Sequence, residues 1–186
     1  MGHLTLIIGC MFSQKTTELM RRIRRYNSIG YKILTVNFIN DTRYGTECIA
    51  SHDRVTEKAI NISNMQEIDA LVRSNEYKVI AIDEGQFFTD LHEYITAWAD
   101  QLDVHIVVAG LDGDAERRPF GDMLKLVPHA EEVERLSAYC AVCCNGTVAI
   151  YSRLLPVENN IKADSHVLIG AAELYQPVCR KHYLQK

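Results

Sequence analysis

The residues best suited to chemistry lie near the amino terminus, in segment 9–17, which reads Gly-Cys-Met-Phe-Ser-Gln-Lys-Thr-Thr. The segment matches the phosphate-binding pattern G-x-x-x-x-G-K-[ST], except that Gln14 stands in place of the second glycine. In such a loop, successive backbone N–H groups surround the phosphates, Lys15 reaches the β- and γ-phosphates, and the Thr16 hydroxyl binds Mg²⁺. We assign phosphate binding to six residues: Gly9, Ser13, Gln14, Lys15, Thr16 and Thr17.

The alternative is an ordinary strand, turn and helix that contains Lys-Thr by chance, and Gln14 keeps this alternative open. Glycine is used where φ is positive or where the backbone approaches a ligand closely. If position 14 requires a positive φ, glutamine costs roughly 1 kcal/mol or more, a strain that a folded protein can carry. If close approach is the reason, the added Cβ atom would push the phosphates outward. The sequence leaves both explanations open.

An acidic pair follows the apolar run 77–82, which has the composition of a buried strand. In open α/β sheets ligands bind at the carboxyl ends of strands, and a nucleotide-binding protein of this type uses an Asp there beside Mg²⁺. Asp83 is therefore the candidate ligand, and Glu84 could accept a proton from an attacking hydroxyl group. Two acids with separate tasks suit transfer to an alcohol better than hydrolysis. The alternative is a solvated acid pair that caps the next helix.

Four potential metal ligands form two pairs with the same spacing, Cys140 with Cys143 and Cys179 with His182. Three Cys and one His make a tetrahedral zinc site. Four protein ligands leave no open coordination position, so the predicted zinc is structural. The long segment between the pairs implies a loop, or lasso, between the two halves of the site. Cys144, next to Cys143, makes the choice of ligand ambiguous, and free thiols are the alternative.

The elements that must position these residues alternate between strands and helices. Apolar, β-branched runs predict strands at 4–8, 32–38, 77–82 and 104–109. Apolar residues at helical spacing predict helices at 15–29, 65–73 and 91–102. Gly30 stands just past the first helix, where glycine favours a helix end. The alternation predicts an α/β fold, with a parallel sheet that has helices on both faces.

The pattern changes beyond about residue 138, where short strand-like pieces, turn residues and cysteines replace the alternation. We therefore expect two domains, an α/β nucleotide-binding domain at 1–138 and a zinc-binding lasso domain at 139–186. The chain of 186 residues is long enough to bury a core of ordinary size.

Composition and charge disfavour several classes of protein. The net charge of −4 argues against a general nucleic-acid binder, and we interpret the basic run 21–25 as the solvated face of a helix. No apolar run reaches the roughly 18 residues needed to span a membrane, and the start of the chain does not have the pattern of a leader peptide. We therefore expect a cytoplasmic protein without nucleic-acid or membrane partners, whose cysteines are thiols or metal ligands rather than disulfides.

These motifs, in this order and spacing, resemble those of the type II thymidine kinases. The resemblance extends over essentially the whole chain and includes further segments at 40–44, 51–53, 83–88, 110–113, 117–120, 136–140 and 175–180. It implies a P-loop sheet followed by a small zinc-binding lasso. It also implies transfer of the ATP γ-phosphoryl group to the 5′-hydroxyl of thymidine, which forms dTMP for nucleotide salvage and DNA synthesis. The implied cofactors are Mg²⁺, bound with ATP, and a structural Zn²⁺.

The resemblance also implies residue roles. Glu84 is the general base on the 5′-hydroxyl group, and Arg43 lies near the transferring phosphoryl group, where a cation stabilises charge. Mg²⁺ binding falls to three residues: Thr16, Asp83 and Asp41. The nucleoside pocket, between the α/β domain and the lasso, has six lining residues: Met11, Phe87, Leu111, Val167, Ile169 and Tyr175. Members of the family are typically tetramers whose pocket also takes the end product, so we expect a homotetramer that uses ATP and thymidine and is subject to feedback by dTTP.

Three residues depart from the family's pattern. Gln14 replaces the loop glycine, and Cys10 replaces a proline in the same loop. Ala115 stands where the family has a phenylalanine against the base, and the loss of one ring could weaken nucleoside binding by roughly 1–3 kcal/mol. These departures keep open a second hypothesis, a catalytically weakened, regulatory nucleotide- or nucleoside-binding protein on the same fold. A third, a zinc-dependent nucleic-acid module, predicts steeply salt-sensitive binding to oligonucleotides.

Overall fold

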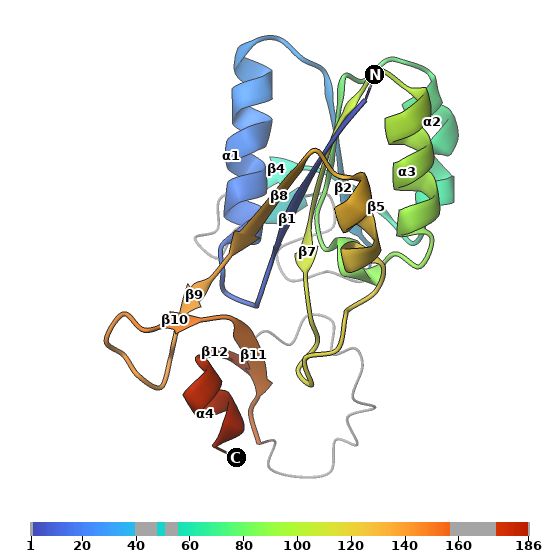
Figure 1. Ribbon diagram of the computed structural model, residues 1–186. Coiled ribbons are helices and arrows are strands. Elements are labelled where there is room, and N and C mark those ends of the chain that lie inside the picture. The colour runs from blue at the N-terminus through green and yellow to red at the C-terminus, as the bar shows by residue number, and fades with distance from the viewer. Residues whose placement is uncertain (1, 40–47, 51–55, 157–173, 186) are drawn as a thin grey trace.

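The structure, a computed structural model, describes residues 2–39, 48–50, 56–156 and 174–185. Within these ranges, the centre of the molecule is a parallel sheet of six strands (Figure 1). From one edge to the other, the strands are β5 (Ile60–Ile62), β2 (Ile33–Phe38), β6 (Val79–Ile82), β7 (His105–Leu111), β1 (His3–Gly9) and β8 (Glu132–Leu136). The predicted α/β fold with a parallel sheet is confirmed.

The inner strands are apolar because helices cover both of their faces. All of β6 is buried, and so are residues 4–9 of β1. Parallel strands in this position carry nearly continuous apolar runs, which is the pattern that the sequence shows. The predicted strands correspond to β1, β2, β6 and β7, and their ends differ from the prediction by at most two residues.

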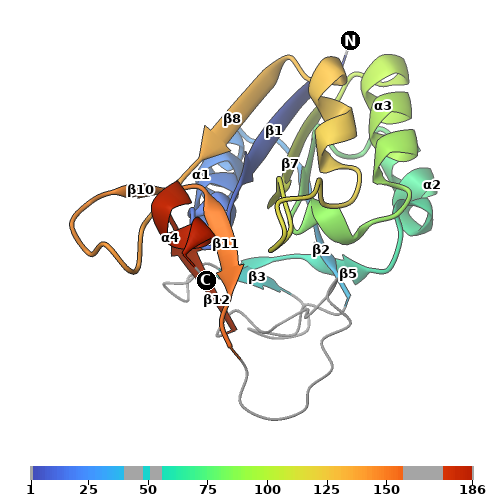
Figure 2. The same ribbon diagram turned by 60° about the horizontal axis from the view of Figure 1, so that its bottom comes forward.

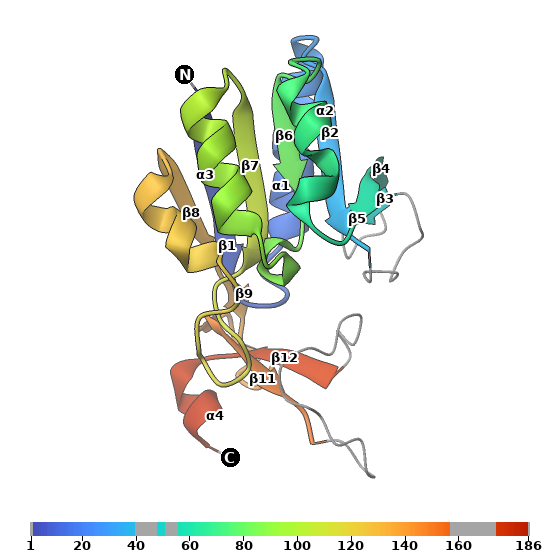
Figure 3. The ribbon, with the colours of Figure 1, turned by 90° about the vertical axis from the view of Figure 1, so that its right-hand side faces the viewer.

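Helices form one layer on each face of the sheet (Figure 1 and Figure 3). Helix α1 (Lys15–Ser28) packs Leu19, Met20 and Ile23 against one face. Helices α2 (Asp69–Arg73) and α3 (Leu91–Gln101) cover the other face, where the larger core includes the fully buried Trp98. The predicted helix 65–73 is a 3₁₀ turn, η1 (Met65–Ile68), followed by α2. Gly30 has a φ of 78° just past α1, which confirms its predicted role at the helix end.

The two edge strands of the sheet, β5 and β8, were not predicted. Strand β8 contains Glu132 and Glu134, which accept hydrogen bonds of 2.8 Å from Arg22 of α1. An edge strand that is open to solvent does not need a continuous apolar run, so its pattern is weak. The antiparallel pair β3 (Cys48–Ala50) and β4 (Thr56–Lys58) and the 3₁₀ turns η2 (Gly85–Phe87) and η3 (Met123–His129) were also not predicted.

After β8 the chain forms two small antiparallel sheets below the carboxyl ends of the parallel strands (Figure 1 and Figure 2). Strand β9 (Ala138–Tyr139) pairs with β10 (Val148–Ala149), and β11 (Tyr151–Leu154) pairs with β12 (Tyr175–Val178), which leads into α4 (Arg180–Leu184). A separate small core of buried side chains stabilises this part. The division into domains at residues 138 and 139 stays a prediction. Among the described residues, no helix has the length and apolar character required to cross a membrane.

Candidate functional site

The predicted phosphate loop joins the carboxyl end of β1 to the start of α1. Gly9 has a φ of 153°, and a Cβ atom on it would lie 2.4 Å from the carbonyl oxygen of Leu136 and 2.9 Å from Oγ of Ser13. Real side chains do not approach this closely, so glycine is required where the loop leaves the strand. Ser13 donates a hydrogen bond of 2.8 Å from Oγ to the carbonyl oxygen of Cys10, which closes the turn.

Gln14 has a φ of 67° and a ψ of 27°, the left-handed conformation that favours glycine. The first of the two explanations for the missing glycine therefore applies, because this position takes a positive φ. The backbone carbonyl of Gln14 accepts the N–H of Glu18 at 3.0 Å in the first turn of α1. Its side chain is exposed, and Oε1 accepts a hydrogen bond of 2.7 Å from the Thr17 hydroxyl.

Lys15 lies inside the loop, and its Nζ donates a hydrogen bond of 2.8 Å to the carbonyl oxygen of Cys10. Burial lowers the pKa of Lys15, while the nearby acidic groups, with Glu84 the strongest, act to raise it. Lys15 thus contacts one backbone carbonyl oxygen and lies near several acidic groups. The contact is consistent with the predicted role of Lys15, which stays a prediction.

Thr16 and Asp83 meet at the sheet's carboxyl edge, although they are far apart in the sequence. The Thr16 hydroxyl, on the first turn of α1, donates a hydrogen bond of 2.9 Å to Oδ2 of Asp83. Asp83 is 5% exposed and directly follows β6, where its N–H donates to the carbonyl oxygen of Val36 at 2.9 Å and so extends the sheet ladder. A hydroxyl and a carboxylate are the oxygen ligands that suit Mg²⁺, so the pair fits this ion.

Glu84 is directed to a different partner from its neighbour Asp83. Its φ of 53° places it in the left-handed region, and its N–H donates to Oδ1 of Asp83 at 3.0 Å. Oε2 of Glu84 accepts a hydrogen bond of 2.5 Å from Nε2 of Gln86, and the Glu84 side chain is half-buried. The two adjacent carboxylates thus accept hydrogen bonds from different side chains, Thr16 and Gln86, although Lys15 acts electrostatically on both. The strained backbone at Glu84 is a feature that the sequence did not indicate.

The described residues of the predicted nucleoside pocket come from four different segments. The Met11 N–H, in the phosphate loop, donates to Oγ of Ser152 on β11 at 2.9 Å. The Phe87 ring, in η2, contacts the rings of Phe38 and Phe120, with centroid distances of 5.3 and 5.6 Å. The other two described members, both half-buried, are Leu111 at the end of β7 and Tyr175 at the start of β12.

Four predicted site residues lie outside the described ranges: Asp41, Arg43, Val167 and Ile169. The third departure from the family pattern is Ala115, whose carbonyl oxygen accepts a hydrogen bond of 2.8 Å from the Tyr183 hydroxyl. The segment that contains position 115 is therefore tied to α4 through its backbone, whichever side chain stands there.

The phosphate loop is also tied to the C-terminal part of the chain. The Cys10 side chain is buried in the small C-terminal core, and its Sγ donates to the carbonyl oxygen of Ala149 at 3.4 Å. Burial raises the pKa of this thiol, which keeps it protonated. Together with the contact between Met11 and Ser152, this hydrogen bond anchors the loop on β10 and β11. Sequence reasoning treated Cys10 only as a missing proline and did not consider Ser152.

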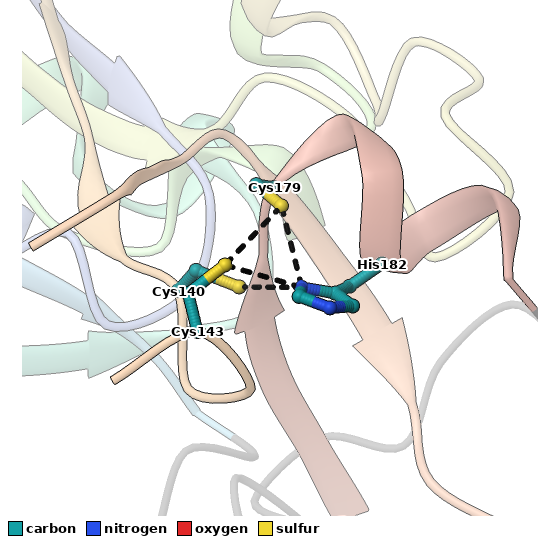
Figure 4. A group of neighbouring side chains, drawn as sticks. All are labelled: Cys140, Cys143, Cys179 and His182. Atoms are coloured by element: carbon teal, nitrogen blue, oxygen red, sulfur yellow. Dashed lines mark hydrogen bonds between the residues drawn. The ribbon is translucent and has the colours of Figure 1, made fainter. Parts of the chain in front are cut away.

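The four predicted zinc ligands converge in space (Figure 4), and their ligand atoms all lie within 4.8 Å of one another. Nδ1 of His182 lies 3.5 Å from Sγ of Cys140, 3.3 Å from Cys143 and 3.4 Å from Cys179. Tetrahedral zinc with Zn–S and Zn–N bonds of ordinary length separates its ligands by roughly 3.5–3.8 Å, so the group fits one Zn²⁺. The Cys144 side chain is exposed and donates to the carbonyl oxygen of Ala141 at 3.0 Å, outside this group.

The Cys140 environment favours a thiolate, the form that binds metal. Burial acts to raise its pKa, but backbone hydrogen bonds from Cys179 and Cys143, together with the His182 side chain, lower it to about 5. The pair Cys140 and Cys143 comes from the turn after β9, whereas Cys179 directly precedes α4 and His182 lies in its first turn. One metal ion would therefore join the two ends of the C-terminal part.

Comparison with known proteins agrees with this arrangement. A family model described as thymidine kinase matches residues 2–183 of the chain. The chain is 42% identical to the thymidine kinase of monkeypox virus over 183 residues, which cover 98% of this chain and 97% of that protein. It is 41% identical, with the same coverage, to the thymidine kinases of variola virus (isolate Human/India/Ind3/1967) and vaccinia virus (strain Western Reserve). The chain belongs to the thymidine kinase family.

Proposed function

We propose that this protein transfers the γ-phosphoryl group of ATP to the 5′-hydroxyl of thymidine and forms dTMP. The observation that carries the proposal is the hydrogen bond between Thr16 and Asp83, with Lys15 and Glu84 close to this pair. This is the set of groups that phosphoryl transfer to an alcohol needs. Relatives over nearly the whole chain are named thymidine kinase, which supports thymidine as the acceptor.

ATP is proposed to bind with its phosphates in loop 9–17. Lys15 would release the carbonyl oxygen of Cys10 and bind the β- and γ-phosphates, where its charge stabilises the transferring group. Thr16 and Asp83 would hold Mg²⁺, together with Asp41. The ion, when bound, neutralises developing charge on the phosphate oxygens. Arg43 is proposed to add a second cation near the same group.

Glu84 is proposed to act as the general base. Its carboxylate would accept the proton of the 5′-hydroxyl group as the oxygen attacks the γ-phosphorus, and ADP would leave with the bond electrons. Separate partners for Glu84 and Asp83 support this division of roles, because a carboxylate engaged by metal cannot also take the proton. The Glu84 carboxylate accepts its hydrogen bond from Gln86, whereas the Asp83 carboxylate accepts one from Thr16.

The nucleoside is proposed to bind where η2, the end of β7 and the start of β12 carry Phe87, Leu111 and Tyr175. Met11 in the loop and the lasso residues Val167 and Ile169 would complete the pocket. We also propose that dTTP inhibits by occupying this pocket and that the chain forms a homotetramer. Competition of dTTP with thymidine in initial-rate measurements tests the first statement, and light scattering at several concentrations tests the second.

Zn²⁺ is proposed to be structural, bound by Cys140, Cys143, Cys179 and His182. Four protein ligands leave no position for a substrate or water, so the metal stabilises the fold rather than reacting. The site is joined to the phosphate loop through the buried core that includes Cys10. Zinc would thereby help to position the loop.

The experiment that tests the proposal is phosphoryl transfer from labelled ATP-Mg to thymidine, with deoxyuridine and deoxycytidine run alongside. Labelled dTMP is the expected product, and Glu84→Gln is expected to abolish turnover while thymidine still raises the melting temperature. No dTMP from folded, zinc-loaded protein would overturn the proposal in favour of a regulatory nucleotide-binding protein. In that case, ligand-induced changes in melting temperature would show which nucleotide or nucleoside binds. Strongly salt-sensitive binding to oligonucleotides would instead favour a nucleic-acid module.

A further inference from the structure

Gln86 is buried in η2, two residues after Glu84, with 3% of its surface exposed. Both ends of its side-chain amide are engaged. Nε2 donates to Oε2 of Glu84 at 2.5 Å, and Oε1 accepts the backbone N–H of Leu111 at 2.9 Å. Because a backbone N–H can only donate, the Leu111 contact fixes which end of the amide is the oxygen. The NH₂ group must therefore face Glu84.

The surroundings of Gln86 leave its side chain little room to move. A Cβ atom on Gly110 would lie 2.8 Å from Oε1 of Gln86, and one on Gly121 would lie 2.2 Å from its carbonyl oxygen. Two glycines thus allow the backbone to close around this residue from two sides. The same hypothetical Cβ atom on Gly110 would lie 2.8 Å from Sδ of Met123, which is fully buried. Close packing holds the amide in a single orientation.

We propose that Gln86 is a positioning residue for phosphoryl transfer, which holds the Glu84 carboxylate in place to accept the proton of the 5′-hydroxyl group. The inference rests on the proposed function, because it requires Glu84 to be the base. A hydrogen bond to a charged acceptor is shorter and stronger than one between neutral groups, so the Gln86 amide is suited to hold the Glu84 carboxylate in one place. The φ of 53° at Glu84 adds to the need for such a restraint, because a strained backbone persists only when its surroundings hold it.

The second contact of the amide gives Gln86 a further task. Leu111 ends β7 and is one of the proposed pocket residues, and its N–H is held by the same amide that holds Glu84. The base and one wall of the nucleoside pocket therefore share one buried anchor. A small displacement between a base and its proton can lower a rate by about 100-fold, so a common anchor is a direct way to control their separation.

Two substitutions separate the two contacts. Gln86→Glu keeps an oxygen for the Leu111 N–H but replaces the donor that faces Glu84 with a second carboxyl group. Gln86→Met has a similar length and removes both contacts. Steady-state kinetics from pH 5.5 to pH 9 for both variants, wild type, Glu84→Gln and the surface control Gln101→Glu constitute the test.

For Gln86→Glu we expect kcat at pH 7 to fall roughly 10- to 100-fold, with the KM for thymidine within about twofold of wild type. The acidic limb of its pH–rate profile should move to higher pH, because two adjacent carboxyl groups retain a shared proton. Gln86→Met should lower kcat and also raise the KM for thymidine, because the Leu111 N–H loses its acceptor. Gln101, at the exposed end of α3, accepts from Arg73 through Oε1, so Gln101→Glu should leave the profile unchanged.

A kcat and an acidic limb that match wild type in both Gln86 variants would overturn the inference. An equal loss of rate at every pH in Gln86→Glu would also overturn the inference. A general disturbance of folding lowers the rate at every pH and leaves the acidic limb of the profile in place. If Gln86→Glu does not fold, the kcat and KM of Gln86→Met decide. Inactive wild-type protein, or an active Glu84→Gln variant, would instead refute the proposed function.

Discussion

The Thr16 hydroxyl donates to Oδ2 of Asp83 at 2.9 Å and so joins the start of α1 to the end of β6. A residue of the phosphate loop motif and a residue of the acidic pair, more than sixty positions apart, meet at one point of the sheet edge. The direction of this hydrogen bond is fixed, because the ionised carboxylate can only accept and the hydroxyl must therefore donate. Replacing Thr16 tests whether the two motifs act as one site.

Thr16→Val removes the donor and leaves Asp83 buried without this hydrogen bond. We expect kcat/KM for ATP to fall by roughly 100-fold or more, because the substitution removes one proposed metal ligand from a phosphoryl-transfer site. Thr16→Ser is the matched control, since it keeps the hydroxyl, and it should retain most of the activity. Initial rates at varied ATP-Mg measure both, and equal activity of the Val and Ser variants would contradict the assignment.

Gln14→Gly should relieve the strain at a φ of 67°. The matched comparison is Gln14→Ala, because both variants lose the contact with Thr17 but only the alanine variant keeps the strain. We expect the free energy of unfolding to be about 0.5–1 kcal/mol higher for Gln14→Gly than for Gln14→Ala. Urea unfolding of the two variants measures this difference. A more stable alanine variant would show that the left-handed backbone is not the feature that matters at this position.

Zinc removal should affect the phosphate loop as well as the C-terminal part. Cys179→Ser is expected to lose zinc and to lower the melting temperature by about 4–8 °C, which corresponds to a loss of roughly 2 kcal/mol. The KM for ATP should rise, because Cys10 and Met11 are anchored on β10 and β11. The matched control is Cys144→Ser, whose thiol lies outside the ligand group, so its zinc content and melting should equal those of wild type. Full zinc content in Cys179→Ser would contradict the ligand assignment.

His105, at the start of β7, should make stability depend on pH. Burial, aided by the neighbouring His3, lowers the pKa of His105, and its Nδ1 is buried without a hydrogen-bond partner in the described structure. The unfolded chain therefore binds a proton more readily, so stability should fall as pH drops below about 6.5 toward the lower folded value. His105→Phe keeps an aromatic ring and should flatten this part of the curve. Urea unfolding of zinc-loaded proteins from pH 7.5 to pH 5.5 compares the two, and identical slopes would contradict the prediction.

Much of this fold could be predicted from local patterns, because the residues concerned are close together in the sequence or recur at regular spacing. The inner strands are apolar on both faces, which is how β1, β6 and β7 were found. The group of three cysteines and one histidine was predicted because each pair of ligands is separated by only two residues, and the structure brings the two pairs together. Strand β8 was missed because an edge strand held partly by ion pairs to Arg22 has no continuous apolar run.

The sequence by itself determined the fold class, and it predicted the phosphate loop, the acidic pair and the metal ligands, because residue type and spacing carry that information. Only the tertiary structure decided how these parts act on one another. The anchoring of Cys10 on the C-terminal core and the contact of Gln86 with Leu111 depend on where distant segments meet. Close packing determines these contacts. No local pattern encodes them, because each joins residues that are far apart in the sequence.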